Sequence, residues 1–421
     1  MRFPRFRALP PTSGLILVMT LLNIAPLHSA GRMLQQTQDA LTLKDARVVV
    51  DYGRTVTFTA RIETALAIEQ ASILIKVTSE EIPRMETITV KEDGSIRFIY
   101  DSAREPLPPF GAVLVWVQVV LEDGKTYSSE PIRFSYNDNR FGWQVVNHGN
   151  LNVHWYAGET SFGAQALNAA VLGLAEMLDF HPTAATEPIH IYIYSNPVDL
   201  QDALAMGGET WAAGHTPPGL DAILVAIEPG PNQSFEMNTE IPHELAHWVL
   251  FRTLREDYDR QPVWLLEGMA YAAELEAHPD HASALQTAHR TGALLPFMDL
   301  CASFPAEAGG AFLAYAQSGS FVNHLRKTYG DAVLVRLTQA YRERGPLDDA
   351  NCALGSLKAL GVPLEQLDEN WRESLPLQEY DSNAVHSLAP FIAVMALILI
   401  VPLWGALEQT RKRRKHGPGS S

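Results

Sequence analysis

His243-Glu244-Leu245-Ala246-His247 lies inside a stretch whose pattern favours an α-helix. An α-helix turns once in about 3.6 residues, so two histidines four positions apart share one face. Both imidazoles can therefore reach one zinc ion at about 2 Å each. Glu244 stands next to the first histidine and can touch a water that zinc activates without being a ligand itself. A general base in zinc-assisted peptide hydrolysis occupies this position.

The pattern alone is a modest signal, because a surface helix with two histidines and a glutamate would show it as well. The expected helix, residues 237–255, is strongly apolar around the motif, which predicts burial of most of its surface. A buried His-Glu-His cluster is costly without a partner, and a zinc ion is the natural one. Pro242 predicts a bend, or a first helical turn, just before the cluster.

A third ligand is expected because catalytic zinc commonly keeps three protein ligands and one open position. Residues 264–271 begin a second apolar helix, with Pro262 suited to its first turn. Glu267 in this apolar run is costly unless it is paired or binds a metal.

The sequence H-E-L-A-H followed by W-L-L-E-G-M-A resembles the gluzincin zinc metallopeptidases, which include thermolysin and the zinc aminopeptidases. It is most similar to their peptidase MA-like branch, over roughly residues 141–375. The resemblance implies one zinc ion held by His243, His247 and Glu267, with Glu244 as the general base.

Two further side chains are candidates for the same site. Residues 314–322 resemble the element in which zinc aminopeptidases place a transition-state-stabilising tyrosine, with one residue more between tyrosine and glycine. This resemblance gives Tyr315 a catalytic role, hydrogen-bonding the oxyanion as it forms; the alternative is a tyrosine packed in the core. Glu274, two helical turns beyond Glu267, is a candidate partner for the second nitrogen of a zinc-bound histidine, or else a solvated helix charge.

One departure from the aminopeptidases concerns the capture of the substrate's free amine. They carry a G-x-M-E-N segment for it, and this sequence has none. Residues 221–227 resemble the edge strand that pairs with an extended substrate in zincins. Endopeptidase activity is therefore favoured over aminopeptidase activity, with Glu228 as a weak substitute for the missing glutamate.

Both ends of the chain carry features of membrane targeting. Residues 1–30 have a basic start, an apolar stretch and small residues at the end, which predicts a secretory signal peptide or, alternatively, an uncleaved anchor. Residues 388–407 form an apolar run of about the length of a membrane span, and the tail that follows, residues 408–421, contains a strongly basic run at 411–415. We therefore expect a single-pass plasma-membrane protein with an extracytoplasmic catalytic domain and a cytoplasmic C-terminus.

The net charge limits the partners of the chain, and the cysteine content limits its possible disulfides. The net charge of −16 disfavours nucleic acid as a partner. The resemblance implies a peptide or protein substrate, the apolar run at 388–407 predicts contact with the membrane, and the oligomeric state is left open. Cys301 and Cys352 are the only cysteines. An oxidising compartment permits one disulfide between them, and two free buried thiols are the alternative.

The first part of the chain, residues 31–139, is strand-like and shows turn signals such as Glu92-Asp93-Gly94. The spacing predicts an all-β sandwich of the immunoglobulin or fibronectin type. The expected strands are residues 48–50, 55–62, 71–77, 86–90, 96–100, 112–121 and 132–136.

A second domain, residues 140–375, follows a polar hinge, and residues 376–387 are the expected linker to the membrane. The resemblance implies an α+β zincin-like (gluzincin) fold here. The pattern favours strands at 151–156 and 190–194 and, outside the motif helices, further helices at 162–178, 311–329, 332–342 and 364–374.

These observations predict a multidomain, membrane-anchored zinc peptidase: a β-sandwich, a zincin-like domain and one transmembrane helix. One alternative is a surface binding or adhesion module whose zincin-like part is not catalytic. Another is a zinc enzyme that acts on a carbonyl other than a peptide.

Overall fold

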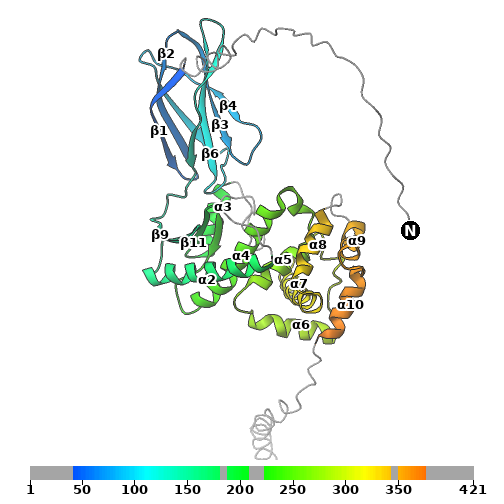
Figure 1. The fold of residues 1–421 in the computed structure, drawn as a ribbon. Helices are drawn as coiled ribbons and strands as arrows, with labels where there is room; N and C mark the ends of the chain where they lie inside the picture. The colour runs from blue at the N-terminus through cyan, green and yellow to red at the C-terminus, as the bar shows by residue number, and fades with distance from the viewer. Residues whose placement is uncertain (1–40, 181–186, 208–221, 343–348, 376–421) are drawn as a thin grey trace, which may run out of the picture. The chain divides into compact units, whose positions relative to one another are not determined.

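The structure is a computed structural model that describes residues 41–180, 187–207, 222–342 and 349–375. The chain divides into two compact units, drawn in Figure 1. Unit 1 takes in the described residues up to Glu105 together with Ala112–Tyr136, and unit 2 takes in Pro106–Gly111 and the described residues from Asn137 onward.

Unit 1 consists of antiparallel strands in two sheets. Alternate side chains of its central strands are buried, for example Val113, Val115 and Val117, because successive residues of a strand face opposite sides. One sheet has the order β1 (Leu41–Asp51), β2 (Thr55–Thr64), β5 (Ser95–Asp101). The other has the order β4 (Arg84–Thr87), β3 (Ile68–Val77), β6 (Ala112–Leu121), β7 (Thr126–Ser128), with β8 (Ile132–Ser135) also paired to β6.

Unit 2 begins with a four-stranded sheet. Its order is β12 (Ile223–Ala226), β11 (Ile189–Tyr194), β10 (Leu151–Trp155), β9 (Gln144–His148). The first three strands are parallel to one another and β9 is antiparallel. Helices α2 (Thr160–Phe180) and α4 (Gln233–Leu254) pack against this sheet, and its isoleucine and valine side chains join theirs in one core.

The motif helix α4 crosses α2 at a close contact. A Cβ added to Gly173 of α2 would lie 2.6 Å from Cβ of Pro242, so a larger side chain there would push the helices apart. α4 begins at Gln233, and Pro242 therefore lies in its interior rather than in its first turn. The packing against α2 thus fixes the part of α4 that directly precedes the two histidines.

The rest of unit 2 is helical (Figure 1). α5 (Val263–Ala273) carries Glu267 and packs against both α4 and α7 (Ala308–Tyr329). Gly268 allows the close approach of α7, because a Cβ there would lie 2.4 Å from Val322. The remaining elements are α3 (Pro197–Met206), η1 (Arg255–Arg260), α6 (Pro279–Thr291), α8 (Ala332–Arg342), α9 (Asp349–Leu360) and α10 (Leu364–Ser374).

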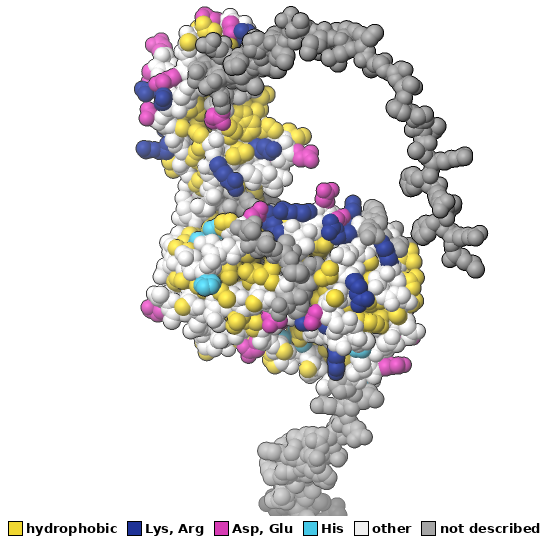
Figure 2. Space-filling view, viewed as in Figure 1, with side chains coloured by type: hydrophobic (Ala, Val, Ile, Leu, Met, Phe, Trp, Pro, Cys, Tyr) yellow, Lys and Arg dark blue, Asp and Glu magenta, His cyan; other side chains and the backbone are white. Residues whose placement is uncertain are grey.

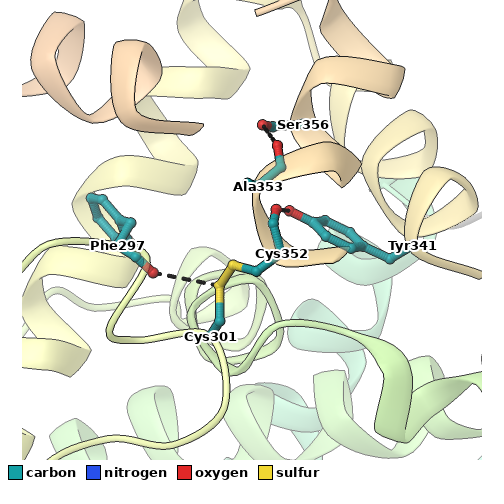
Figure 3. The surroundings of a disulfide bond; sticks show 6 residues. All are labelled: Phe297, Cys301, Tyr341, Cys352, Ala353 and Ser356. Atoms are coloured by element: carbon teal, nitrogen blue, oxygen red, sulfur yellow. Dashed lines mark hydrogen bonds between the residues drawn. A yellow bond between two sulfur atoms is a disulfide. The ribbon is translucent and has the colours of Figure 1, made fainter. Parts of the chain in front are cut away.

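A disulfide joins Cys301 to Cys352, which confirms the pairing expected from the sequence and excludes two free thiols (Figure 3). It ties α9 to the segment that caps α5. The amide of Val263 donates to the carbonyl of Cys301 at 2.8 Å, and the amide of Trp264 donates to Leu300 at 3.1 Å. These bonds satisfy amides that the first turn of a helix leaves without an internal partner.

The surface carries charges of both signs: acidic and basic side chains intermingle on the face that Figure 2 shows. In the described residues, no helix is both long and apolar enough to cross a membrane. A span needs about 20 apolar residues. α5 is strongly apolar but has only 11 residues, and the longer helices α2, α4 and α7 carry charged side chains.

This finding contradicts the predicted fold class with its transmembrane helix, and with it the predicted single-pass plasma-membrane localisation. The fold class is corrected to a β-rich unit followed by a largely helical unit that contains a four-stranded sheet. The expected signal peptide (1–30), linker (376–387), transmembrane helix (388–407) and basic tail (408–421) lie outside the described residues.

Candidate metal centre

Two helices of unit 2 bring three ligand-type side chains together. His243 and His247 lie one turn apart on α4, and Glu267 lies in the first half of α5. His247 and Glu267 are buried and His243 is nearly so. Among the described residues, these three form the one group of three or more metal-binding side chains close enough to hold an ion.

The three donor atoms form a nearly equilateral triangle. Nε2 of His243 and Nε2 of His247 are 3.3 Å apart. Oε2 of Glu267 lies 3.4 Å from the first and 3.3 Å from the second. A tetrahedral zinc site with ligands at about 2.0–2.1 Å has edges of about 3.3–3.4 Å. The donor set of two imidazoles and one carboxylate, and its spacing, therefore fit a zinc ion with one position left open.

The second ring nitrogen of each histidine also has a partner. Nδ1 of His243 lies 3.0 Å from Oε1 of Glu274, and Nδ1 of His247 lies 3.0 Å from the hydroxyl of Tyr258. With Nδ1 as the donor, each bond leaves the lone pair on Nε2, the nitrogen that faces the triangle. The contact expected of Glu274 is confirmed, although this residue lies just past the end of α5 in extended backbone and not on the helix.

Tyr258 is a site residue that sequence reasoning missed. α4 ends at Leu254, and Arg255 has a φ of 54°, a conformation uncommon outside glycine. The short helix η1 follows, and Tyr258 within it lies back against His247. Helical spacing does not predict this contact, because the chain leaves the α-helix between the two residues.

Carboxylates govern the charge of His243. Burial lowers the pKa of this histidine, but the hydrogen bonds to Glu267 and Glu274 outweigh burial and hold it well above its ordinary value. Without a metal ion, the raised pKa favours the protonated form of His243. A metal ion bound by the three donor atoms would have to displace that proton.

The two predicted catalytic residues both lie near the triangle. Glu244 is buried, with 4% of its surface exposed, and directly follows His243 on α4. The ring of Tyr315, on α7, lies 6.5 Å from the ring of His243 and packs against Phe304. Burial, followed by the charges of Glu267 and Glu244, raises the pKa of Tyr315, so its hydroxyl keeps its proton at neutral pH.

The strand expected to pair with substrate is found in part. Within the described residues, β12 is one of the two edge strands of the sheet and runs parallel to β11. Asp221, the first residue of the expected strand, lies outside those residues, and Glu228 is exposed just beyond β12.

Solved structures give only weak similarities. A myokine structure is 14% identical with a TM-score of 0.18, and the match covers 23% of this chain and 95% of that one. A polysaccharide deacetylase from Bacillus cereus and a purple acid phosphatase from yellow lupin seeds are each 10% identical with TM-scores of 0.20. The matches cover 48% and 49% of this chain, and 66% and 40% of those chains. TM-scores this low carry no argument about fold or function.

A family model is more informative. No curated protein matches this chain significantly. Residues 169–376, however, match the model described as the Peptidase MA superfamily. The matched segment contains His243, His247 and Glu267 and begins inside α2. The match relates this part of the chain to a zincin-like peptidase family.

Proposed function

We propose that this protein is a zinc-dependent peptidase of the gluzincin type, with one zinc ion held by His243, His247 and Glu267. The triangle of donor atoms with edges of 3.3–3.4 Å carries the proposal, because it fits tetrahedral zinc. The family match over residues 169–376 supports it independently.

A bound zinc ion would supply a Lewis acid that polarises a carbonyl group and makes water more acidic. Glu244 is the general base: it accepts a proton from the attacking water and passes it to the leaving amine. Its burial beside His243 supports this role, because a carboxylate shielded from bulk water keeps its orientation. Glu274 and Tyr258 hold the two imidazoles in the orientation that exposes Nε2.

Tyr315 is proposed to donate a hydrogen bond to the oxyanion that forms on the substrate carbonyl. Its raised pKa supports this role, because only a protonated phenol can donate. The distance of 6.5 Å between its ring centre and that of His243 also supports this role.

Endopeptidase activity is favoured within this proposal. The sequence has no G-x-M-E-N segment to capture a free amine, and Glu228 is exposed beyond β12. Peptides with a blocked N-terminus are therefore expected to be cleaved as readily as free ones.

The test is the substitution Glu244→Gln in the full chain. We expect it to keep one zinc ion per chain and to lower hydrolysis of a mixed peptide library by at least about 10²-fold, because the general base is lost. Glu176→Gln is the matched control: Glu176 is an exposed glutamate on the neighbouring helix α2, and this variant is expected to keep both zinc and activity. His243→Ala should lose zinc and activity together.

Each outcome decides between the candidate functions. Equal turnover by Glu244→Gln and wild type would refute the mechanism. A wild-type protein that binds zinc but cleaves no peptide in the library would favour the non-catalytic binding module. Absence of zinc from the wild-type protein would refute the metal centre itself.

A further inference from the structure

A second pair of histidines lies in unit 2, on the other face of its sheet. Leu151, Val153 and Trp155 of β10 point into the core that the sheet shares with α2 and α4. His154 therefore points to the opposite face, because the side chains of a strand alternate. The same alternation in β11, where Ile189 and Ile191 are buried in the core, places His190 on the face of His154.

The two imidazoles approach each other edge to edge. Nε2 of His154 lies 3.0 Å from Nδ1 of His190, and both side chains are half-buried. Burial lowers the pKa of His154 to about 4 and lowers that of His190 as well. Both rings are therefore neutral at neutral pH, as metal ligation requires.

An aromatic stack holds His154 in place. Its ring lies parallel to Tyr192, with the centres 4.2 Å apart, and Phe110 stacks on the far side of Tyr192 at 3.6 Å. The ring of Trp143 packs edge-on against Tyr192. The stack fixes the plane of the His154 ring and leaves its Nε2 edge directed at His190.

We propose that His154 and His190 form a second, weaker zinc site, separate from the centre on α4 and α5. The separation of 3.0 Å between the two nitrogens lies close to the tetrahedral edge of about 3.3 Å. Both rings must turn so that their lone pairs meet at the ion, and His154 can turn within its own plane and keep its stack on Tyr192. Imidazole nitrogen is a preferred zinc ligand, and the net charge of −16 favours cation binding in general.

Binding needs a change of tautomer and no loss of a proton. In the hydrogen-bonded pair, one ring donates its N–H to the other. When that proton moves to the donor ring's outer nitrogen, both facing nitrogens present lone pairs to the ion. In the described residues this pair is not part of any three-ligand group, so water fills the remaining positions. The site is therefore weaker than the three-ligand centre.

The experiment is equilibrium dialysis of the metal-free full chain against increasing Zn²⁺ at neutral pH, with zinc counted per chain. His154→Phe removes the ligand nitrogen but keeps an aromatic ring on Tyr192, so the fold is preserved. We expect this variant to bind one zinc ion fewer than wild type at saturation, and His190→Phe to behave in the same way. Circular dichroism melts verify that both variants are folded.

His148→Phe is the matched control. His148 is exposed on the neighbouring strand β9, where it pairs with Leu151. Directly paired residues share a face, so His148 lies on the face of Leu151 and not on that of His154 and His190. This variant should bind as many zinc ions as wild type. The deciding quantity is the difference in zinc ions per chain between wild type and each variant. The test therefore holds whether or not the centre on α4 and α5 binds zinc. Equal zinc counts for wild type and both folded variants, His154→Phe and His190→Phe, would overturn the proposal.

Discussion

At the scale of single residues, the candidate centre depends on the group that contacts Nδ1 of each histidine. Glu274 contacts His243 through a carboxylate, whereas Tyr258 contacts His247 through a phenol. A carboxylate attracts a proton to its imidazole, whereas a phenol mainly orients the ring. The two histidines should therefore respond differently when their partners are removed.

Tyr258→Phe removes the hydroxyl that lies 3.0 Å from Nδ1 of His247 and leaves the aromatic packing against Phe251 in place. We expect zinc affinity to fall about 10–100-fold, because the ring of His247 loses its orienting bond. Competition with a zinc chelator measures the change. Tyr329→Phe at the end of α7 is the control, and an equal loss in both variants would mean that the contact with His247 is not the cause.

The pH dependence of zinc binding follows from the carboxylates around His243. The raised pKa of this group stabilises the metal-free fold at low pH, and the contribution is lost as pH rises through the folded-state pKa. Zinc must displace this proton, so affinity should rise about tenfold per pH unit from about pH 6.5 upward until His243 is neutral. Calorimetry in buffers of different ionisation enthalpy counts the released proton, and in Glu274→Gln the count should be smaller.

At the scale of elements, the position of Glu267 depends on how closely α5 and α7 approach. Gly268→Ala would place a Cβ 2.4 Å from Val322 and 2.6 Å from the carbonyl oxygen of Ser318. We expect a loss of about 1–3 kcal/mol in the free energy of unfolding and weaker zinc binding, because α5 must shift and carries its ligand with it. Urea unfolding with and without zinc measures both effects.

Gly230→Ala is the control for this substitution, since nothing lies within 4 Å of a Cβ added there. It should leave both quantities unchanged. Unchanged zinc binding in Gly268→Ala would mean that α5 holds Glu267 in place without its contact with α7.

The elements with a strong apolar period were predictable. The helices expected at 332–342 and 364–374 are α8 and α10 with the same bounds. α6 was not predicted, because it buries only His281 and Ala288 and so lacks a continuous apolar face, although Pro279 at its start and Gly292 at its end are typical helix signals. Tyr258 was missed for another reason: its contact depends on the turn at Arg255, and neither spacing nor composition indicates that turn.

At the scale of the whole molecule, the predictions from local spacing and the prediction from hydropathy had different outcomes. The sequence was sufficient to predict that three side chains lie close together: His243, His247 and Glu267. Helical spacing and the cost of a buried carboxylate can each be recognised within a short stretch of sequence. The apolar run at 388–407 led to a membrane-anchored fold class, and the described residues contain no helix suited to a span. Hydropathy alone was not a sufficient basis for that part of the prediction.

The two units are separately compact, and this has a consequence for unfolding. All three candidate zinc ligands lie in unit 2. A ligand that binds only the folded form of one unit raises the stability of that unit alone. We therefore expect two thermal transitions by calorimetry, and removal of zinc with a chelator should lower one of them and leave the other in place. Glu267→Gln should lower the same transition even with zinc present, because the carboxylate ligand is lost. A single transition that shifts as a whole would contradict this expectation and would mean that the β-rich unit and the helical unit unfold as one.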